Sequence, residues 1–160
     1  MRICIIFILF FSTLITNSQV VINEYSASNY DTYQDNYGEY EDWIELYNNS
    51  ANPIDLNGWM LTDKPNNPSK WVFPGSFILP ANGVVLVYCS GRDEVMGGNA
   101  HSNFKITQTK GNEVIMLSDA SGILQDSIRV FPNQKSHTRG RQTDGAITWS
   151  VFTTGTPNAT

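Results

Sequence analysis

Carboxylates are concentrated in the stretch DTYQDNYGEYED, residues 31–42. An oxygen-rich loop of this kind can bind a hard cation such as Ca²⁺, which takes about six to eight oxygen ligands. The spacing departs from that of an EF-hand loop, because Gly38 comes two places late and Tyr33 occupies a ligand position. Three interpretations stay open: a calcium site, a solvated loop, or a partner-binding surface. All three involve the same acids, which are Asp31, Asp35, Glu39, Glu41 and Asp42.

Paired acids such as Glu41 and Asp42 are also the residue type that a glycosidase uses as its catalytic acid and base. Such an enzyme places two carboxyl groups about 5–10 Å apart across a sugar-binding cleft. Sequence does not supply that distance, and many surface loops contain paired acids. We therefore predict no catalytic residues, and we expect the chain not to be an enzyme.

The two histidines, His101 and His137, lie far apart in the sequence. Neither has a second His or Cys at the spacing of metal ligands. Ser102 follows His101 directly, but catalytic triads are spatial arrangements, so this neighbour indicates nothing. Both histidines are predicted to be surface loop residues, and no cofactor is predicted apart from the calcium alternative.

Basic residues are absent between Arg2 and Lys64, and four of them cluster near the end of the chain. A basic patch can bind phosphates or anionic glycans. The net charge of −5 and the lack of a nucleic-acid-binding motif argue against nucleic acid as a partner. The expected role is instead packing over aromatic rings or pairing with the acidic half of the chain. The four residues, which surround His137, are Arg129, Lys135, Arg139 and Arg141.

Four tryptophans could stack on sugar rings, because their aromatic faces are flat. Three of them fall within strand-like runs, so packing in the core or at a strand edge is favoured. They are Trp43, Trp59, Trp71 and Trp149.

The acidic, basic and aromatic side chains discussed above must be positioned by regular structure. Short runs rich in Val, Ile, Trp and Tyr are the candidates for it. They are VVINEYS, DWIELYN, GWMLTD, KWVFPG, GVVLVYCS, NEVIMLSD and ILQDSIRV. Turn residues separate them, and no window shows a helical stripe of useful length. This pattern predicts an all-β sandwich or barrel. The segments 27–41 and 91–103 are expected to be long loops.

The run WIELY fixes the direction of its side chains, because a strand alternates between two faces. Ile44 and Leu46 share the face that suits the interior. Trp43, Glu45 and Tyr47 share the other face, which a loop is expected to cover. A buried Glu45 would then need a hydrogen-bond partner.

The order of these runs resembles the lamin tail domain family, an immunoglobulin-like β-sandwich. VVINEYSASN is similar to its opening strand, and EDWIELYNNSANPIDLNGWMLTD to its signature segment. WVFPGSFILPANGVVLVYCS, HSNFKITQTKGNEVIMLSDASGILQDSI and GRQTDGAITWSVFTTGTPNA are similar to the later parts. Members of the family usually close with Thr-Pro-Gly-x-Asn, whereas here Asn158 follows Pro157 directly. The resemblance implies the fold, and it brings no catalytic residues because none define the family.

The first residues are predicted to be a secretory signal. Arg2 precedes an apolar run, and small polar residues lead to Gln19, so we expect cleavage after Ser18. The domain organisation is then a signal peptide at 1–18 and one sandwich domain at 19–160. The mature chain keeps nine basic and fifteen acidic residues and a single cysteine, Cys89, which is expected to be a small buried hydrophobe.

These features, together with the family resemblance, predict a secreted or cell-surface module of the bacterial type, with no membrane association after the signal is removed. The expected partner is a protein or a surface glycan, or the module serves as a spacer. A glycan-binding or calcium-dependent adhesion module is the alternative.

Overall fold

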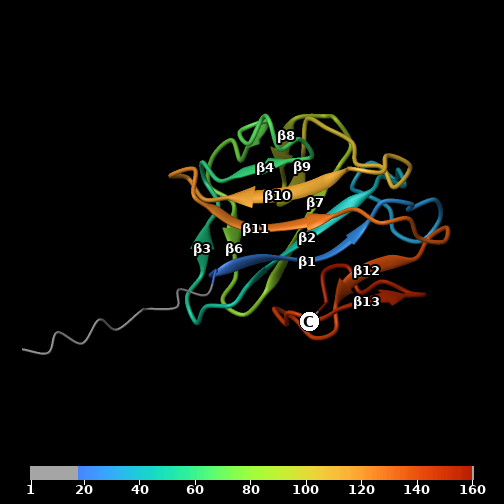
Figure 1. Cartoon of the computed structure of the whole chain (residues 1–160). Coiled ribbons are helices and arrows are strands. Elements are labelled where there is room, and N and C mark those ends of the chain that lie inside the picture. Colours follow the sequence, from blue (N-terminus) through green and yellow to red (C-terminus); the bar gives the residue numbers. More distant parts are fainter. Residues whose placement is uncertain (1–17, 160) are drawn as a thin grey trace, which may run out of the picture.

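A computed structural model describes residues 18–159, and every regular element in this part of the chain is a β-strand. Seven strands form the largest sheet, in the order β13-β12-β1-β2-β7-β9-β8 (Figure 1). In chain order they are β1 (Val20–Ser26), β2 (Trp43–Asn48), β7 (Val84–Tyr88), β8 (Glu94–Met96), β9 (Asn99–His101), β12 (Thr138–Arg141) and β13 (Trp149–Phe152).

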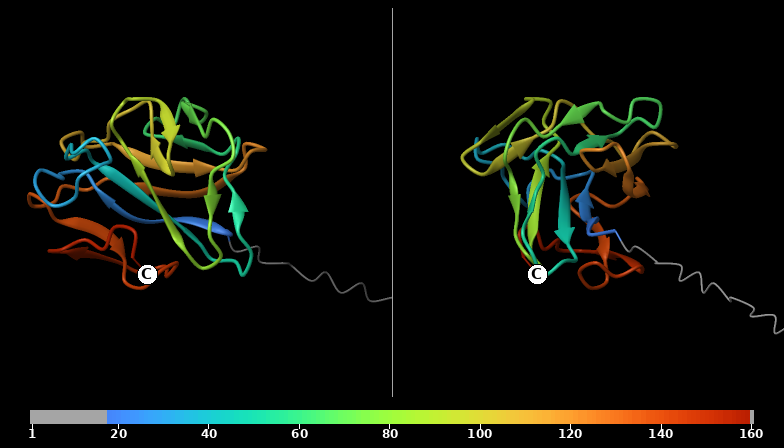
Figure 2. Two further views of the ribbon diagram at one scale, coloured as in Figure 1. Left: turned by 180° about the vertical axis from the view of Figure 1, so that it is seen from behind. Right: turned by 90° about the vertical axis from the view of Figure 1, so that its left-hand side faces the viewer.

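A four-stranded sheet packs against this one in the order β11-β10-β4-β5. Its strands are β4 (Met60–Thr62), β5 (Trp71–Val72), β10 (Val114–Ser118) and β11 (Leu124–Arg129). A small third sheet pairs β3 (Ile54–Asp55) with β6 (Ile78–Leu79). The layers are visible from two further sides in Figure 2.

One hydrophobic core lies between the two main sheets. Ile44 and Leu46 of β2 meet Leu61 of β4 and Leu117 of β10 there, all with no exposed surface. Alternate residues of a half-buried strand face opposite sides, and that alternation supplies both inner surfaces. The all-β, immunoglobulin-like sandwich predicted from the sequence is confirmed.

The predicted direction of the β2 side chains is also confirmed. Trp43 lies on the opposite face from Ile44 and packs with Leu86, Tyr88 and Tyr33 in a second cluster. Tyr33 belongs to the loop between β1 and β2, so that loop covers part of the outer face. The aromatic side chains of this part of the face are therefore shielded from solvent.

The remaining outer face is covered by the chain after β13. Glu45 is fully buried there and accepts hydrogen bonds from Asn23 Nδ2 at 3.0 Å and from the Asn158 N–H at 2.9 Å. Glu24, its cross-strand neighbour, accepts from the Thr156 N–H at 3.2 Å. Asn158 has a φ of 61°, a conformation that asparagine tolerates, and it makes the closing turn without the usual glycine. Two buried carboxyl groups therefore accept hydrogen bonds from the C-terminal segment.

Segment 91–103, expected to be a loop, contains strands β8 and β9 instead. They form a hairpin whose two connecting residues, Gly97 and Gly98, have φ values of 60° and 83°. Gly-Gly is a known hairpin signal, but the flanking residues do not alternate between apolar and polar. Residues 99–101 therefore form a strand because they pair with β7, and local propensity alone does not predict it.

Strands β12 and β13 were not predicted as strands either. β12 (TRGR) has no apolar residue, so its sequence gives no strand signal. It forms because β1 offers it an edge, and β13 then adds to β12.

The tryptophans pack as predicted: Trp43, Trp59 and Trp71 are buried, and Trp149 is half-buried. Cys89 is a free, buried thiol, as expected, and burial raises its pKa. Residues 1–17 of the predicted signal peptide lie outside the described part of the chain. Within residues 18–159, no helix has the length and apolarity that a membrane span needs.

Candidate functional site

The loop between β1 and β2 is fixed from inside by Asn29. The buried Asn29 amide donates to the Tyr33 carbonyl at 2.6 Å and to the Glu41 carbonyl at 2.8 Å. Its oxygen accepts from the Thr32 hydroxyl at 2.8 Å, and its backbone N–H donates to Asp42 Oδ1 at 2.9 Å. One side chain thereby ties together both ends of the loop, which therefore presents its outer residues in a defined geometry.

Asp35 stabilises the tip of this loop. It is buried, and its Oδ1 accepts from the N–H groups of Tyr37 at 2.8 Å and Glu39 at 2.9 Å. Its Oδ2 lies 3.1 Å from Nη1 of Arg92, whose guanidinium lies over the Tyr37 ring at 4.6 Å. Both oxygens of Asp35 thus have protein partners.

His101 is fully buried, so the prediction that it is a surface residue is wrong. Its Nε2 lies 2.7 Å from Asn36 Oδ1, and its Nδ1 lies 3.0 Å from Ser90 Oγ. The ring stacks on Tyr88 at 4.9 Å, and burial lowers its pKa. Strand β9 carries His101 inward, and this was missed because the hairpin was missed. His137, by contrast, lies half-buried in the turn before β12.

The order Ser90, His101, Asn36 resembles a catalytic relay, but its surroundings are those of a structural network. Ser90 is 8% exposed, and its oxygen already accepts from the Arg92 N–H at 3.2 Å. His101 lies beneath aromatic rings, so a substrate has no access to it. The hydrogen bond between Asn36 and His101 instead holds the tip of the loop against β9.

The other predicted site residues point to different partners. Asp31 is exposed and lies 2.8 Å from Lys135 Nζ. Glu41 lies 2.9 Å from Lys105 Nζ, and Glu39 is exposed. Asp35 and Glu41 share one partner, because Arg92 Nη1 also lies 3.6 Å from Glu41 Oε1, but the five acids do not gather at one point. Within residues 18–159, no group of three or more His, Cys, Asp or Glu side chains could hold a metal ion.

Calcium at millimolar concentration is expected to leave the melting temperature almost unchanged. Asp35 is already satisfied by Arg92 and by two N–H groups, and Asp31 pairs with Lys135. Differential scanning fluorimetry with calcium, and with sodium at matched ionic strength, measures this. A calcium-specific rise above roughly three degrees that Asp35→Ala abolishes would show that a cation site forms after all.

An open cleft of about 330 Å³ lies between this loop and residues 105–109. We call it the tyrosine cleft, because Tyr30 and Tyr40 line it and expose 63% and 43% of their surface. Most of the other side chains at the cleft are polar, and Ala27 and Cys89 also line it. The polar ones include Asn29, Asp42, Lys105, Thr107, Gln108 and Thr109.

Asp42 gives the cleft an acid that titrates close to neutral pH. Its burial raises the pKa to about 6, although the hydrogen bond from the Asn29 N–H acts in the opposite direction. Near pH 6 this carboxyl group therefore exchanges between an acceptor and a donor. Lys105, whose side chain is mostly exposed, pairs with Glu41 at 2.9 Å and adds ammonium donors beside it.

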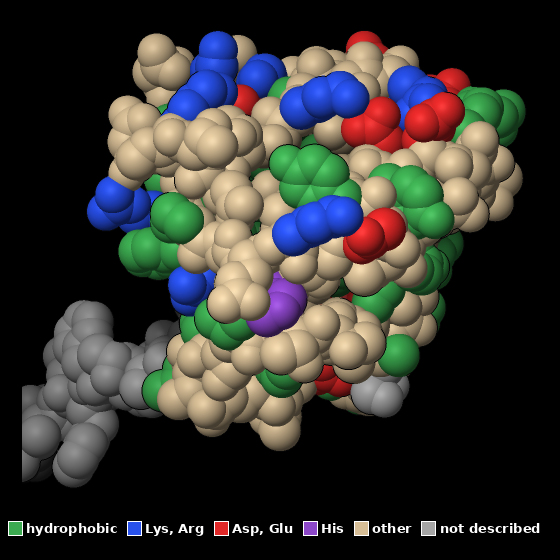
Figure 3. Space-filling view, turned by 90° about the vertical axis from the view of Figure 1, so that its right-hand side faces the viewer, with side chains coloured by type: hydrophobic (Ala, Val, Ile, Leu, Met, Phe, Trp, Pro, Cys, Tyr) green, Lys and Arg blue, Asp and Glu red, His purple; other side chains and the backbone are tan. Residues whose placement is uncertain are grey.

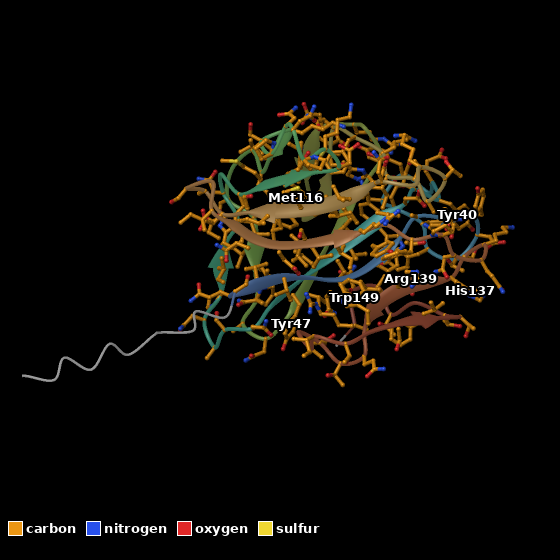
Figure 4. The ribbon with its side chains drawn as sticks, viewed as in Figure 1. Tyr40, Tyr47, Met116, His137, Arg139 and Trp149 are labelled. Atoms are coloured by element: carbon orange, nitrogen blue, oxygen red, sulfur yellow. The ribbon has the colours of Figure 1, made fainter. Side chains whose placement is uncertain are left out.

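The predicted basic cluster is confirmed as a set of arginines and a lysine packed over aromatic rings. Arg141 lies over Trp149 at 5.2 Å and pairs with Asp126 at 2.7 Å, while Lys135 lies over Tyr30 at 5.6 Å. One side view of the molecule shows Lys and Arg side chains among hydrophobic and acidic ones (Figure 3). Tyr40, His137 and Arg139 lie at the same end of the sandwich (Figure 4).

The sequence analysis named the acids of this loop but did not name Tyr30 or Tyr40. Tyr30 and Tyr40 stand in a polar segment without strand alternation, and such aromatic residues have no core to enter. That signal could have identified them. Residues 107–109 gave no signal, because their place beside the loop follows from the tertiary structure alone.

The family model described as Lamin Tail Domain matches residues 15–131 of this chain. The chain therefore belongs to the lamin tail domain family. The match runs from just before β1 to just beyond β11, so it includes the loop of the tyrosine cleft. A search of curated proteins finds no match.

Proposed function

We propose that this protein is an exported, non-enzymatic recognition module that binds a surface glycan in the tyrosine cleft. One observation carries the proposal: two exposed tyrosines line a cleft in which most of the other side chains are hydrogen-bonding groups. Sugar rings have apolar C–H faces, which pack on aromatic rings, and hydroxyl edges, which hydrogen-bond to such groups. The cleft offers both kinds of contact in one place.

The size of the cleft supports a glycan in preference to a folded protein partner. A cleft of about 330 Å³ falls in the range of small-ligand pockets, roughly 300–1,000 Å³. Stable protein interfaces bury about 800 Å² on each partner over a wide surface. The internal bonds of Asn29 hold the loop in place before binding, and this lowers the entropy lost on association.

Removal of both tyrosine rings is expected to weaken glycan binding about five- to 150-fold. Aromatic stacking contributes about 0.5–1.5 kcal/mol per ring, and 1.4 kcal/mol corresponds to a factor of ten. Purified wild-type protein and Tyr30→Ala/Tyr40→Ala are applied to an array of neutral and acidic oligosaccharides. The melting temperature should stay close to that of the wild type, because both side chains are exposed.

The matched control is Tyr30→Phe/Tyr40→Phe, which keeps both rings and should keep most of the binding. Two results contradict the proposal. One is a wild-type protein that binds no glycan on the array. The other is an alanine variant that binds as well as the wild type.

A further inference from the structure

We infer that Arg129, Phe131 and Arg139 form an anion-binding subsite beside the tyrosine cleft. The subsite would bind sulfate or carboxylate groups of an acidic polysaccharide. The inference rests on the glycan recognition proposed above. It adds that the glycan is negatively charged. Within residues 18–159, Arg129 and Arg139 take part in no ion pair, so their charges are available to a ligand.

The first support is the arrangement of the two arginines. Their guanidinium carbons lie 5.5 Å and 5.3 Å from the centroid of the same ring, that of Phe131. Arg129 also donates to the Gly111 carbonyl, and Arg139 donates to the Pro132 carbonyl at 3.3 Å. Stacking and these bonds restrict both side chains, so less conformational entropy is lost when an anion binds.

The second support is their charge. Among residues 18–159, neither arginine forms an ion pair, whereas Arg92, Lys105, Lys135 and Arg141 each have a carboxylate partner. The Nε of Arg139 is buried and has no hydrogen-bond partner within that range. Each guanidinium carries five N–H donors and binds planar oxyanions through two at once. Two such groups on one ring therefore provide cationic donors that no carboxylate among residues 18–159 pairs with.

The third support is the position of the subsite. Asn133, two residues after Phe131, donates its N–H to Gln108 Oε1 at 2.6 Å, and Gln108 lines the tyrosine cleft. Ser136 donates its N–H to the Ser28 carbonyl of the cleft loop at 2.8 Å. The cleft and the arginines thus lie on adjoining segments of one end of the sandwich. A polymer with sugar rings in the cleft can place a charged group on the arginines.

The negative net charge of the chain favours a ligand that is bound partly through its sugar rings. It disfavours a polyanion that is bound by electrostatic attraction alone. The chain has a net charge of −5, which repels polyanions that rely on long-range attraction. A ligand that also stacks on Tyr30 and Tyr40 needs only a few anionic groups. An acidic peptide lacks the sugar rings for that contact.

The test measures binding of the purified protein to four soluble polymers by isothermal titration calorimetry. They are sulfated dextran, polygalacturonate, uncharged dextran and polyglutamate. Arg129→Gln and Arg139→Gln should each weaken binding to the preferred acidic polysaccharide about tenfold, because each loses charge-assisted hydrogen bonds. The matched control is Lys64→Gln, which removes the same charge at an exposed position elsewhere and should change affinity less than about twofold.

The inference is overturned if the arginine variants lose no more affinity than Lys64→Gln. It is also overturned if polyglutamate binds as tightly as the acidic polysaccharides with the same dependence on arginine. Failure of the proposed function has a different signature. Tyr30→Ala/Tyr40→Ala would then bind every polymer as the wild type does, while the arginine variants still lose affinity for the acidic ones.

Discussion

Leu46→Ala is expected to lower the free energy of unfolding by about 2–5 kcal/mol, the usual cost of an emptied core site. Leu46 has no exposed surface and lies in the centre of the seven-stranded sheet, within the main core cluster. Neighbours on both sheets are held by their own strands, so they cannot fill the cavity. Urea unfolding followed by tryptophan fluorescence measures the change.

The matched control is Leu124→Ala, the same substitution on the edge strand β11. Leu124 is 50% exposed, so this change should cost less than about 1 kcal/mol. A cost below about 0.5 kcal/mol for Leu46→Ala would mean that β2 does not direct this residue into the core.

Glu45→Gln is expected to remove much of the pH dependence of stability between pH 4.5 and pH 7. Burial raises the pKa of Glu45 from 4.5 to about 7, and the nearby Glu24 acts in the same direction, against the hydrogen bonds from Asn23 and Asn158. The folded state therefore holds this proton more tightly than the unfolded chain does. Stability from this group is complete below pH 4.5 and is lost as the pH rises through about 7.

The shift corresponds to about 3 kcal/mol. At pH 8 the uncharged Gln variant should therefore be more stable than the wild type by up to about that amount. At pH 4.5 the variant should be less stable than the wild type by about 1–2 kcal/mol, because the glutamine NH2 cannot accept one of the two hydrogen bonds that Glu45 accepts from Asn23 and Asn158. Urea unfolding across this pH range gives both values.

Glu39→Gln is the control for this experiment, because it makes the same substitution at an exposed position. Asp42 has a raised pKa of about 6, so some of the same slope remains in the Glu45→Gln protein. A Gln variant less stable than the wild type at pH 8 would show that the ionised carboxylate stabilises the C-terminal segment.

The sequence by itself determined the fold class and the direction of the central strands. In WIELY, alternation of apolar side chains assigned Ile44 and Leu46 to the core, because a strand with one face in the core has a period of two. The same reasoning required a partner for the buried Glu45, and Asn23 and Asn158 supply it. Local pattern is sufficient where burial of apolar surface dominates the energy of a segment.

Only the tertiary structure decided where the polar side chains go. Asp31 and Asp35 are neighbours in one acidic run, yet one pairs with Lys135 and the other with Arg92. His101 became buried because β9 pairs with β7, and β12 became a strand because β1 offered it an edge. Hydrogen bonds and ion pairs depend on which distant segment lies opposite, and no periodicity in the chain records that partner. The tyrosine cleft and the arginine subsite arise in the same way, from segments that are distant in sequence and packed together at one end of the sandwich.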